Sequence, residues 1–366
     1  MRSRWRWLGW PLLALMLGGC ADAGYYAQAL AGHARLLSAA RPIPDWLADP
    51  ATPPALHARL QLARQLRRYA VTDLGLPDNA SYTRYADLHR SAVVWNVVAA
   101  PDDSLTPRTW CFVLAGCVSY RGYFDQAEAQ ALADSLRAQG LEVSVYGVPA
   151  YSTLGWSNAI GGDPLLNTFV HQPEADLARL LFHELAHQVV YVADDSVFNE
   201  SFATAVERLG GAQWLAQHAS EAERQADARQ LHQRTALRDL ARQTRQALAA
   251  LYANPGHRPR SAILADKAEV MASLRRRYAE LRARWQADGV EEARLRGTDA
   301  WVAGVNNATL AAMNAYDELV PGFEALHARV NGNAPGGWGR FYAAVRALAA
   351  QPPAARRQAL QDAARP

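Results

Sequence analysis

The apolar positions of the chain predict helices at both ends with a short run of strands between them. Over residues 22–75 they recur at near-helical spacing on either side of a proline-rich break. Asp125, with Glu128 three residues later, predicts the start of a helix that Gly140 ends. Before and after that helix the apolar runs are of β type. The expected strands lie at 93–98, 110–114, 118–123 and 141–148.

Helical spacing returns after a glycine-containing loop over 149–169. Pro173 begins a helix that is expected to run to about Tyr191, and a second helix is expected over 199–209 after a tight turn. Gly210 and Gly211 are expected to stop that second helix.

The remainder of the chain is rich in helix-forming residues. A single break at 254–256 divides residues 220–293, which predicts a long antiparallel helical hairpin. Further helices are expected over 300–348, and the tail after residue 351 is expected to be loose.

Composition and charge narrow the class of protein. Half of the 366 residues are apolar and 20% are charged, and only the N-terminus carries a long apolar run, as in globular rather than multi-spanning membrane proteins. The net charge of +3 comes entirely from Arg2, Arg4 and Arg6. A body with balanced charge argues against nucleic acid as the main partner.

The N-terminus has the three parts of a secretory signal. Basic residues precede an apolar stretch at 7–17, which is too short to span a bilayer, and small residues follow directly before Cys20. Residues 17–20, Leu-Gly-Gly-Cys, resemble the bacterial lipobox, in which the cysteine is lipidated and becomes the first mature residue. Ala21 at the next position implies, by the same resemblance, the outer membrane. We therefore expect an anchor on the periplasmic side of the cell envelope.

Cys111 and Cys117 are the remaining cysteines. An oxidising periplasm would let them pair across a tight hairpin. The alternative is two buried thiols in neighbouring strands. Two cysteines without a second pair make a poor metal site.

The run His183-Glu184-Leu185-Ala186-His187 lies within a predicted helix. Residues i and i+4 share a helical face, so both imidazoles can reach one cation while Glu184 points beside them. This is the zincin arrangement. The alternative is two histidines that make ordinary hydrogen bonds and a surface glutamate.

Glu200 is the expected third metal ligand. It lies thirteen residues after His187, in a run at 198–203 that resembles the Asn-Glu-x-x-Ala segment of gluzincins. Asp194 and Asp195 are alternative ligands, or else a helix cap or support for the ligands. The absence of a nearby third histidine argues against a metzincin.

Several segments together are similar to the bacterial family of putative aminopeptidase lipoproteins, over nearly the whole chain. They are the lipobox and residues 117–124, 151–156, 183–187, 198–203 and 306–308. The resemblance implies a zinc-dependent peptidase of the cell envelope with a peptide substrate. The chain has no Gly-x-Met-Glu-Asn segment, with which better-known aminopeptidases hold the α-amine of the substrate. The sequence therefore supports a peptidase more strongly than it supports an aminopeptidase.

The expected mechanism follows from these residues. Zn²⁺ held by His183, His187 and Glu200 activates a water molecule, and Glu184 takes its proton and passes it to the leaving amine. Tyr151, Tyr120 and Tyr316 are candidates to stabilise the oxyanion. Tyr151 is favoured because it follows the strand that ends at residue 148, which in zincins commonly pairs with extended substrate.

Three further polar residues have more than one interpretation. Asn306 and Asn307 interrupt an apolar helical region, either as a helix cap or as part of a substrate-binding wall. Glu207 lies on roughly the same helical face as Glu200, and could orient a ligand, bind an amine or be solvated.

We therefore expect an α+β, mainly helical protein with a zincin-like small sheet and an active-site helix. The expected divisions are a signal peptide at 1–19, an N-terminal helical segment at 20–80, a catalytic core at 81–215, a C-terminal helical domain at 216–350 and a loose tail at 351–366. Alternative functions are a non-catalytic envelope lipoprotein with structural zinc, such as an assembly factor or chaperone, or a zinc amidase that acts on a cell-wall amide. The intact Glu184 argues against a structural site, which has no use for a base.

Overall fold

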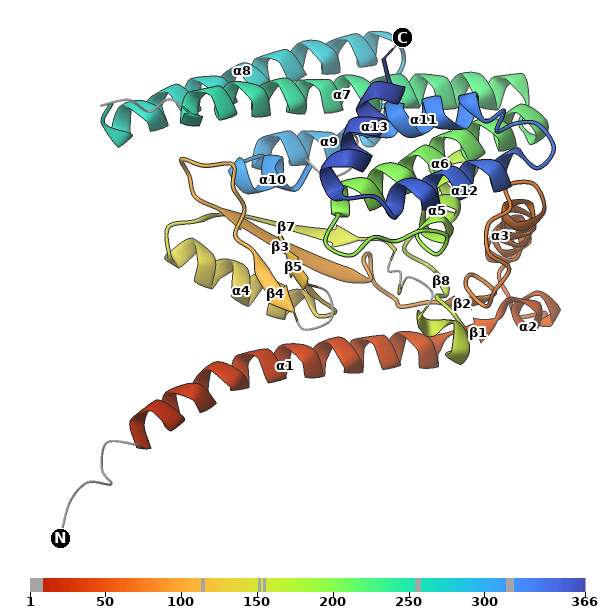
Figure 1. The fold of residues 1–366 in the computed structure, drawn as a ribbon, viewed down its shortest axis with the longest axis horizontal. Coiled ribbons are helices and arrows are strands. Elements are labelled where there is room, and N and C mark those ends of the chain that lie inside the picture. The colour runs from red at the N-terminus through yellow and green to blue at the C-terminus, as the bar shows by residue number, and fades with distance from the viewer. Residues whose placement is uncertain are drawn as a thin grey trace.

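The computed structural model describes residues 9–112, 116–150, 153, 156–253, 258–313 and 319–365. It confirms the predicted class, because helices dominate and the sheets are small (Figure 1). None of the helices in these ranges is both long enough and apolar enough to cross a membrane.

The N-terminal helices are α1 (Gly9–Ala39), α2 (Ile43–Ala48) and α3 (Pro54–Thr72). Figure 1 shows α1 lying along one side of the body, with its first turns extending beyond it. Its second half packs against strand β6 and the adjoining loop. The side chain of Gln28 donates to the carbonyl of Gly122 and accepts from the amide of Phe124. Gly32 lies so close to the Phe124 ring that a Cβ there would be 2.2 Å from it.

The central sheet has three antiparallel strands in the order β6-β3-β7. One face of β3 packs on α4, with Val97 and Ala99 against Ala129 and Ala133, and its other face packs on α10. Asp125 caps α4 by accepting from two amides of the first turn. The strands and their flanking helix are β3 (Val94–Ala100), β6 (Arg121–Tyr123), β7 (Glu142–Val148) and α4 (Gln126–Ala138).

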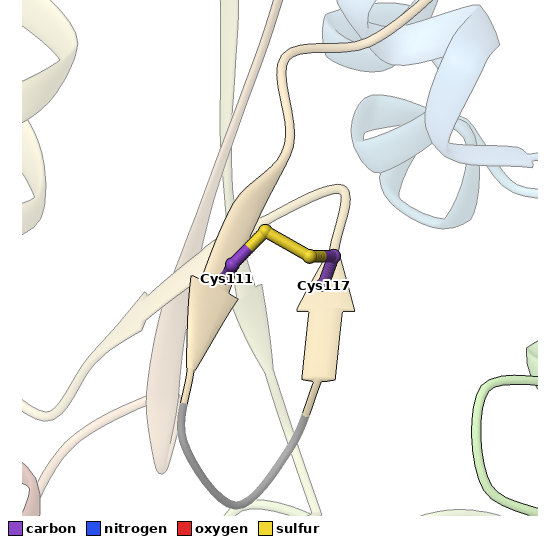
Figure 2. The surroundings of a disulfide bond; sticks show 2 residues. All are labelled: Cys111 and Cys117. Atoms are coloured by element: carbon purple, nitrogen blue, oxygen red, sulfur yellow. A yellow bond between two sulfur atoms is a disulfide. The ribbon is translucent and has the colours of Figure 1, made fainter.

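Two smaller sheets flank this one. The first has the order β1-β2-β8, and the second is a hairpin of β4 and β5 in which Cys111 lies directly opposite Cys117. A disulfide bond joins the two cysteines across the hairpin (Figure 2). These strands are β1 (Arg41–Pro42), β2 (Arg84–Ala86), β4 (Trp110–Phe112), β5 (Gly116–Val118) and β8 (Leu165–Leu166).

After a 3-10 turn at Trp156–Ile160, helices α5 (Glu174–Ala186) and α6 (Ser196–His218) pack side by side. The first ends before the predicted Tyr191. The prediction that Gly210 and Gly211 stop the second helix was wrong. A Cβ at Gly210 would lie 2.7 Å from Leu74, and one at Gly211 would lie 2.8 Å from Arg179. The glycines are therefore positions of close approach to α5 and to the segment that follows α3, and this packing outweighs their low helix propensity.

The predicted helical hairpin consists of α7 (Glu221–Ala253) and α8 (Arg260–Ala287), which lie along each other in Figure 1. Together with α9 and α10 it encloses a core of its own, separate from the core around α5 and α6. The helices that follow are α9 (Glu292–Gly304), α10 (Asn307–Ala312), α11 (Val320–Arg329) and α12 (Gly337–Ala349).

The expectation of a loose tail after residue 351 was also wrong. The tail forms α13 (Pro353–Ala363), which packs against α11 with Leu360 fully buried. Arg356 is buried as well and forms an ion pair of 2.8 Å with Asp195. Helix α11 and Asp195, the two partners of the tail, are not adjacent to it in the sequence. The pattern of apolar residues in the tail therefore did not predict these contacts.

Candidate metal centre

Three side chains from two helices converge where α5 meets α6. His183 lies in the last turn of α5, His187 is the residue directly after this helix, and Glu200 comes from the second turn of α6. The Nε2 atoms of the two histidines are 3.2 Å apart. Oε2 of Glu200 lies 3.4 Å from Nε2 of His183 and 3.8 Å from Nε2 of His187. We call these three residues the metal group, because their ligand atoms all lie within 4.8 Å of one another.

The spacing within the metal group fits a zinc ion. Tetrahedral zinc bonded at about 2.0–2.1 Å separates neighbouring ligand atoms by roughly 3.3 Å. The observed separations of 3.2, 3.4 and 3.8 Å are close to that value. Two imidazole nitrogens and one carboxylate oxygen are also a ligand set of catalytic zinc sites, which keep a fourth position open.

The loop between α5 and α6 is held in place by side chains at its C-terminal end, where α6 begins. The amide group of Asn199 closes on Val192, accepting from its N–H at 2.8 Å and donating to its carbonyl at 2.7 Å. Asp195 caps α6 by accepting from the N–H of Phe198, and Arg356 of α13 holds the other carboxylate oxygen. Asp195 is therefore a helix cap, and neither it nor Asp194 belongs to the metal group. This arrangement fixes the position of Glu200.

Glu207 supports the metal group from the next turns of α6. Its Oε2 lies 3.0 Å from Nδ1 of His183. A carboxylate there favours the tautomer that carries its proton on Nδ1, so the lone pair of Nε2 faces Glu200 and His187. Of the interpretations drawn from the sequence, orientation of a ligand agrees with this contact.

The protein groups set the charge state of each ligand. Burial tends to lower the pKa of His183, but hydrogen bonds to Glu200 and Glu207 outweigh it and raise that pKa to about 10. Burial and the charge of His183 lower the pKa of His187 to about 4. Burial acts to raise the pKa of Glu200, yet the hydrogen bond to His183 brings it below its ordinary value. A cation that binds His183 must displace a proton, so its binding strengthens as pH rises.

Glu184 follows His183 directly and is only partly buried. Burial raises the pKa of its carboxyl to about 7, the charge of His183 opposes that shift, and the charges of Glu200 and Asp163 add to it. A carboxyl that titrates near neutral pH can both accept and return a proton.

A protein family described as "Putative aminopeptidase" matches residues 24–360, which include the metal group, Glu184 and strand β7. The chain belongs to this family. The description suggests peptidase activity at the level of the family. Comparisons with curated proteins and with solved structures give no match.

Two tyrosines interact electrostatically with Glu200 of the metal group. Tyr120 and Tyr146 are 43% and 39% exposed, and the charge of Glu200 acts on both. Burial chiefly raises the pKa of Tyr120, to about 12, and burial also raises that of Tyr146, so both phenols keep their protons at neutral pH. Tyr120 is one of the candidates predicted from the sequence, and Tyr146 is not. The only feature of the sequence that could have pointed to Tyr146 is its position in β7, the strand that precedes the helix with His183. Tyr151 and Tyr316, the other candidates, lie outside the described residues.

Asn306 and Asn307 are engaged in the fold of this family member. Asn306 caps α10 by accepting from the amide of Thr309, and it also donates to the carbonyl of Val143. Asn307 is fully buried, and its side-chain amide donates to two backbone carbonyls. These bonds agree with the cap interpretation and provide no support for the substrate-binding role.

Proposed function

We propose that this protein is a zinc-dependent peptidase. The observation that supports it most directly is the convergence of His183, His187 and Glu200 at zinc-like spacing, with Glu184 adjacent to the first ligand. A purely structural site gains nothing from an additional carboxyl next to one of its ligands. The family description supports hydrolysis of peptides over other amides.

Each residue then has a distinct role. His183, His187 and Glu200 hold the zinc ion, which when bound supplies the Lewis acidity for hydrolysis. Glu184 accepts the proton of the attacking water and returns it to the leaving amine. Glu207 keeps His183 in the tautomer that binds metal.

The surroundings of the metal group suit an extended peptide. Strand β7 pairs with β3 along one edge, and no other strand within the described ranges pairs with its second edge. Residues 143–146 of β7 line the cleft that also contains His183. We assign to β7 the backbone pairing with substrate and to Tyr120 and Tyr146 the donation of hydrogen bonds to the carbonyl under attack.

We further propose that the enzyme is attached to the periplasmic side of the bacterial cell envelope, at the outer membrane, through a lipid on Cys20. The sequence pattern at 17–20 supports this location. The disulfide between Cys111 and Cys117 is compatible with it, because such bonds persist in oxidising compartments.

The test combines metal analysis with an unbiased substrate screen. The chain from residue 21 onward is incubated with a mixed peptide library, and cleavage positions are determined by mass spectrometry. We expect one zinc ion per chain, cleavage of peptides, and loss of zinc in His183→Ala and His187→Ala. Unchanged stoichiometric zinc in both variants, or a zinc-loaded wild type that cleaves no peptide, would contradict the proposal.

A further inference from the structure

One member of the metal group, His183, lines a large cleft. The cleft has a volume of about 1370 Å³ and extends from His183 and Glu207 to helices α7, α9 and α10. Strand β7 forms one side of it and α7 contributes another. Figure 1 shows α7 running past α6, α9 and α10. Side chains from residues 235–246 of α7 line the cleft. A substrate that extends from His183 into this cleft would meet the side chains of α7.

The wall formed by α7 is basic. Arg238, Arg242 and Arg245 all line the cleft, and their spacing of four and three residues puts them on one helical face. Arg208 of α6 lines the same space. Glu207 and Asp239 are the carboxylates among the lining residues, and Glu207 is already bound to His183. The cleft beside the metal group therefore carries an excess of positive charge.

The arginines differ in how their charge is balanced. Arg242 pairs with Asp239 at 3.1 Å, and Arg208 lies 3.9 Å from Glu324. Arg245 forms no hydrogen bond or ion pair with any described residue, and its Nε is buried without a partner. Burial is the sole influence that lowers the pKa of Arg245, so no nearby acid offsets it. A guanidinium stays charged under all ordinary conditions, so its partial desolvation is unfavourable unless an anion compensates for it.

A peptide can supply that anion. The planar guanidinium matches a carboxylate in a two-pronged hydrogen-bonded pair, and peptides carry carboxylates at their C-terminus and on acidic side chains. We propose that Arg245, with Arg242 and Arg238 beside it, forms a subsite for a substrate carboxylate, so that the enzyme prefers peptides with an anionic group next to the cleaved segment. The inference rests on the proposed peptidase function and adds a substrate class to it.

The test measures peptide binding apart from hydrolysis. Full-length Glu184→Gln protein, loaded with zinc, is titrated calorimetrically with a short alanine-based peptide in matched forms. One pair has a free or an amidated C-terminus, and the other has glutamate or glutamine at an internal position with the C-terminus amidated. We expect one of the anionic forms to bind about 10- to 100-fold more tightly than its neutral partner, as for hydrogen bonds to a charged group. The pair that shows the preference identifies which carboxylate the subsite takes.

Substitutions then assign the preference to the subsite. Arg245→Gln should abolish the difference between anionic and neutral peptides while leaving the affinity for the neutral form unchanged. Arg245→Lys should retain part of the preference, and Arg242→Gln should reduce it less than Arg245→Gln does. Arg276→Gln is the matched control, because Arg276 is exposed on α8 and pairs with Glu269 outside the cleft. Thermal unfolding of each variant verifies that it folds.

The possible failures can be told apart. Equal binding of anionic and neutral peptides by the parent protein would overturn the subsite, and so would an equal loss of both in Arg245→Gln. Either result leaves the proposed function intact if wild-type protein cleaves neutral peptides. A wild type that cleaves no peptide, but whose Glu184→Gln form binds the anionic one through Arg245, would retain the subsite and refute the peptidase.

Discussion

Nδ1 of His183 lies 3.0 Å from Oε2 of Glu207. Glu207 follows Glu200, the third member of the metal group, by seven residues on α6. A single helix therefore supplies both a metal ligand and the carboxylate that orients another ligand. Such a partner fixes the tautomer and the ring plane of the histidine and increases its basicity.

Glu207→Gln should weaken zinc binding without abolishing it. The amide retains the shape of the side chain but loses the charge, and comparable outer-shell substitutions reduce metal affinity by about 10- to 100-fold. Competition with a fluorescent zinc chelator measures the change. Glu223→Gln, an exposed glutamate of α7 away from the metal group, is the control. Identical zinc affinity in Glu207→Gln and wild type would show that the contact has no effect on the metal.

Glu184→Gln and Glu200→Gln should affect different properties, hydrolysis in the first variant and zinc affinity in the second. Glu184 is not in the metal group, so its amide variant should keep its zinc and its stability while hydrolysis falls by about 10²–10⁴. Glu200→Gln loses an anionic ligand, so zinc affinity should fall first and activity as a consequence. Zinc content and turnover are measured on the same preparations. The reverse pattern, with zinc lost in Glu184→Gln and kept in Glu200→Gln, would mean that the roles are exchanged.

The disulfide should form in exported protein and contribute modestly to stability. Cys111 and Cys117 are exposed, and their bond closes only a short hairpin loop. Both should resist alkylation until reductant is added. The double serine variant should lower the free energy of unfolding by no more than about 2 kcal/mol, as expected for a loop of this length. Alkylation of both thiols without reductant would disprove the pairing in the exported protein.

Arg356→Ala should destabilise the protein by about 3 kcal/mol, because it leaves the largely buried carboxylate of Asp195 without its charged partner. Arg365→Ala, which breaks the exposed pair with Asp362, should change stability by less than about 1 kcal/mol. Urea denaturation measures both. Equal stability of the two variants would show that the tail does not support the body of the protein.

The sequence predicted the elements that depend on local pattern. The two histidines of the metal group are fixed by their spacing on one helix, and Glu200 by the segment around it. The strand at 142–148 and the capped helix after Asp125 could likewise be predicted from neighbouring residues alone. What remained open depended on packing between distant segments. Glu207 could be assigned only once α6 was seen against α5, and the close approach of those helices depends on Gly210 and Gly211.

The cleft arginines illustrate the same limit. Arg245 lies in a polar, helix-forming stretch in which a charged residue is usually solvated. Only the folded structure shows that Arg245 lines a cleft together with β7, α9 and α10, and that its buried Nε has no hydrogen-bond partner among the described residues. A strand likewise has two faces, and the register of β7 against β3 decides which of them bears Tyr146.

The bond between Arg356 and Asp195 also bears on the order in which the protein can mature. Asp195 caps the helix that carries Glu200, and its partner lies in the last helix of the chain. A nascent chain therefore lacks this support until Arg356 has been synthesised. Acquisition of the metal should therefore follow synthesis of α13, so a protein truncated before residue 353 would be recovered with little zinc although every ligand is present.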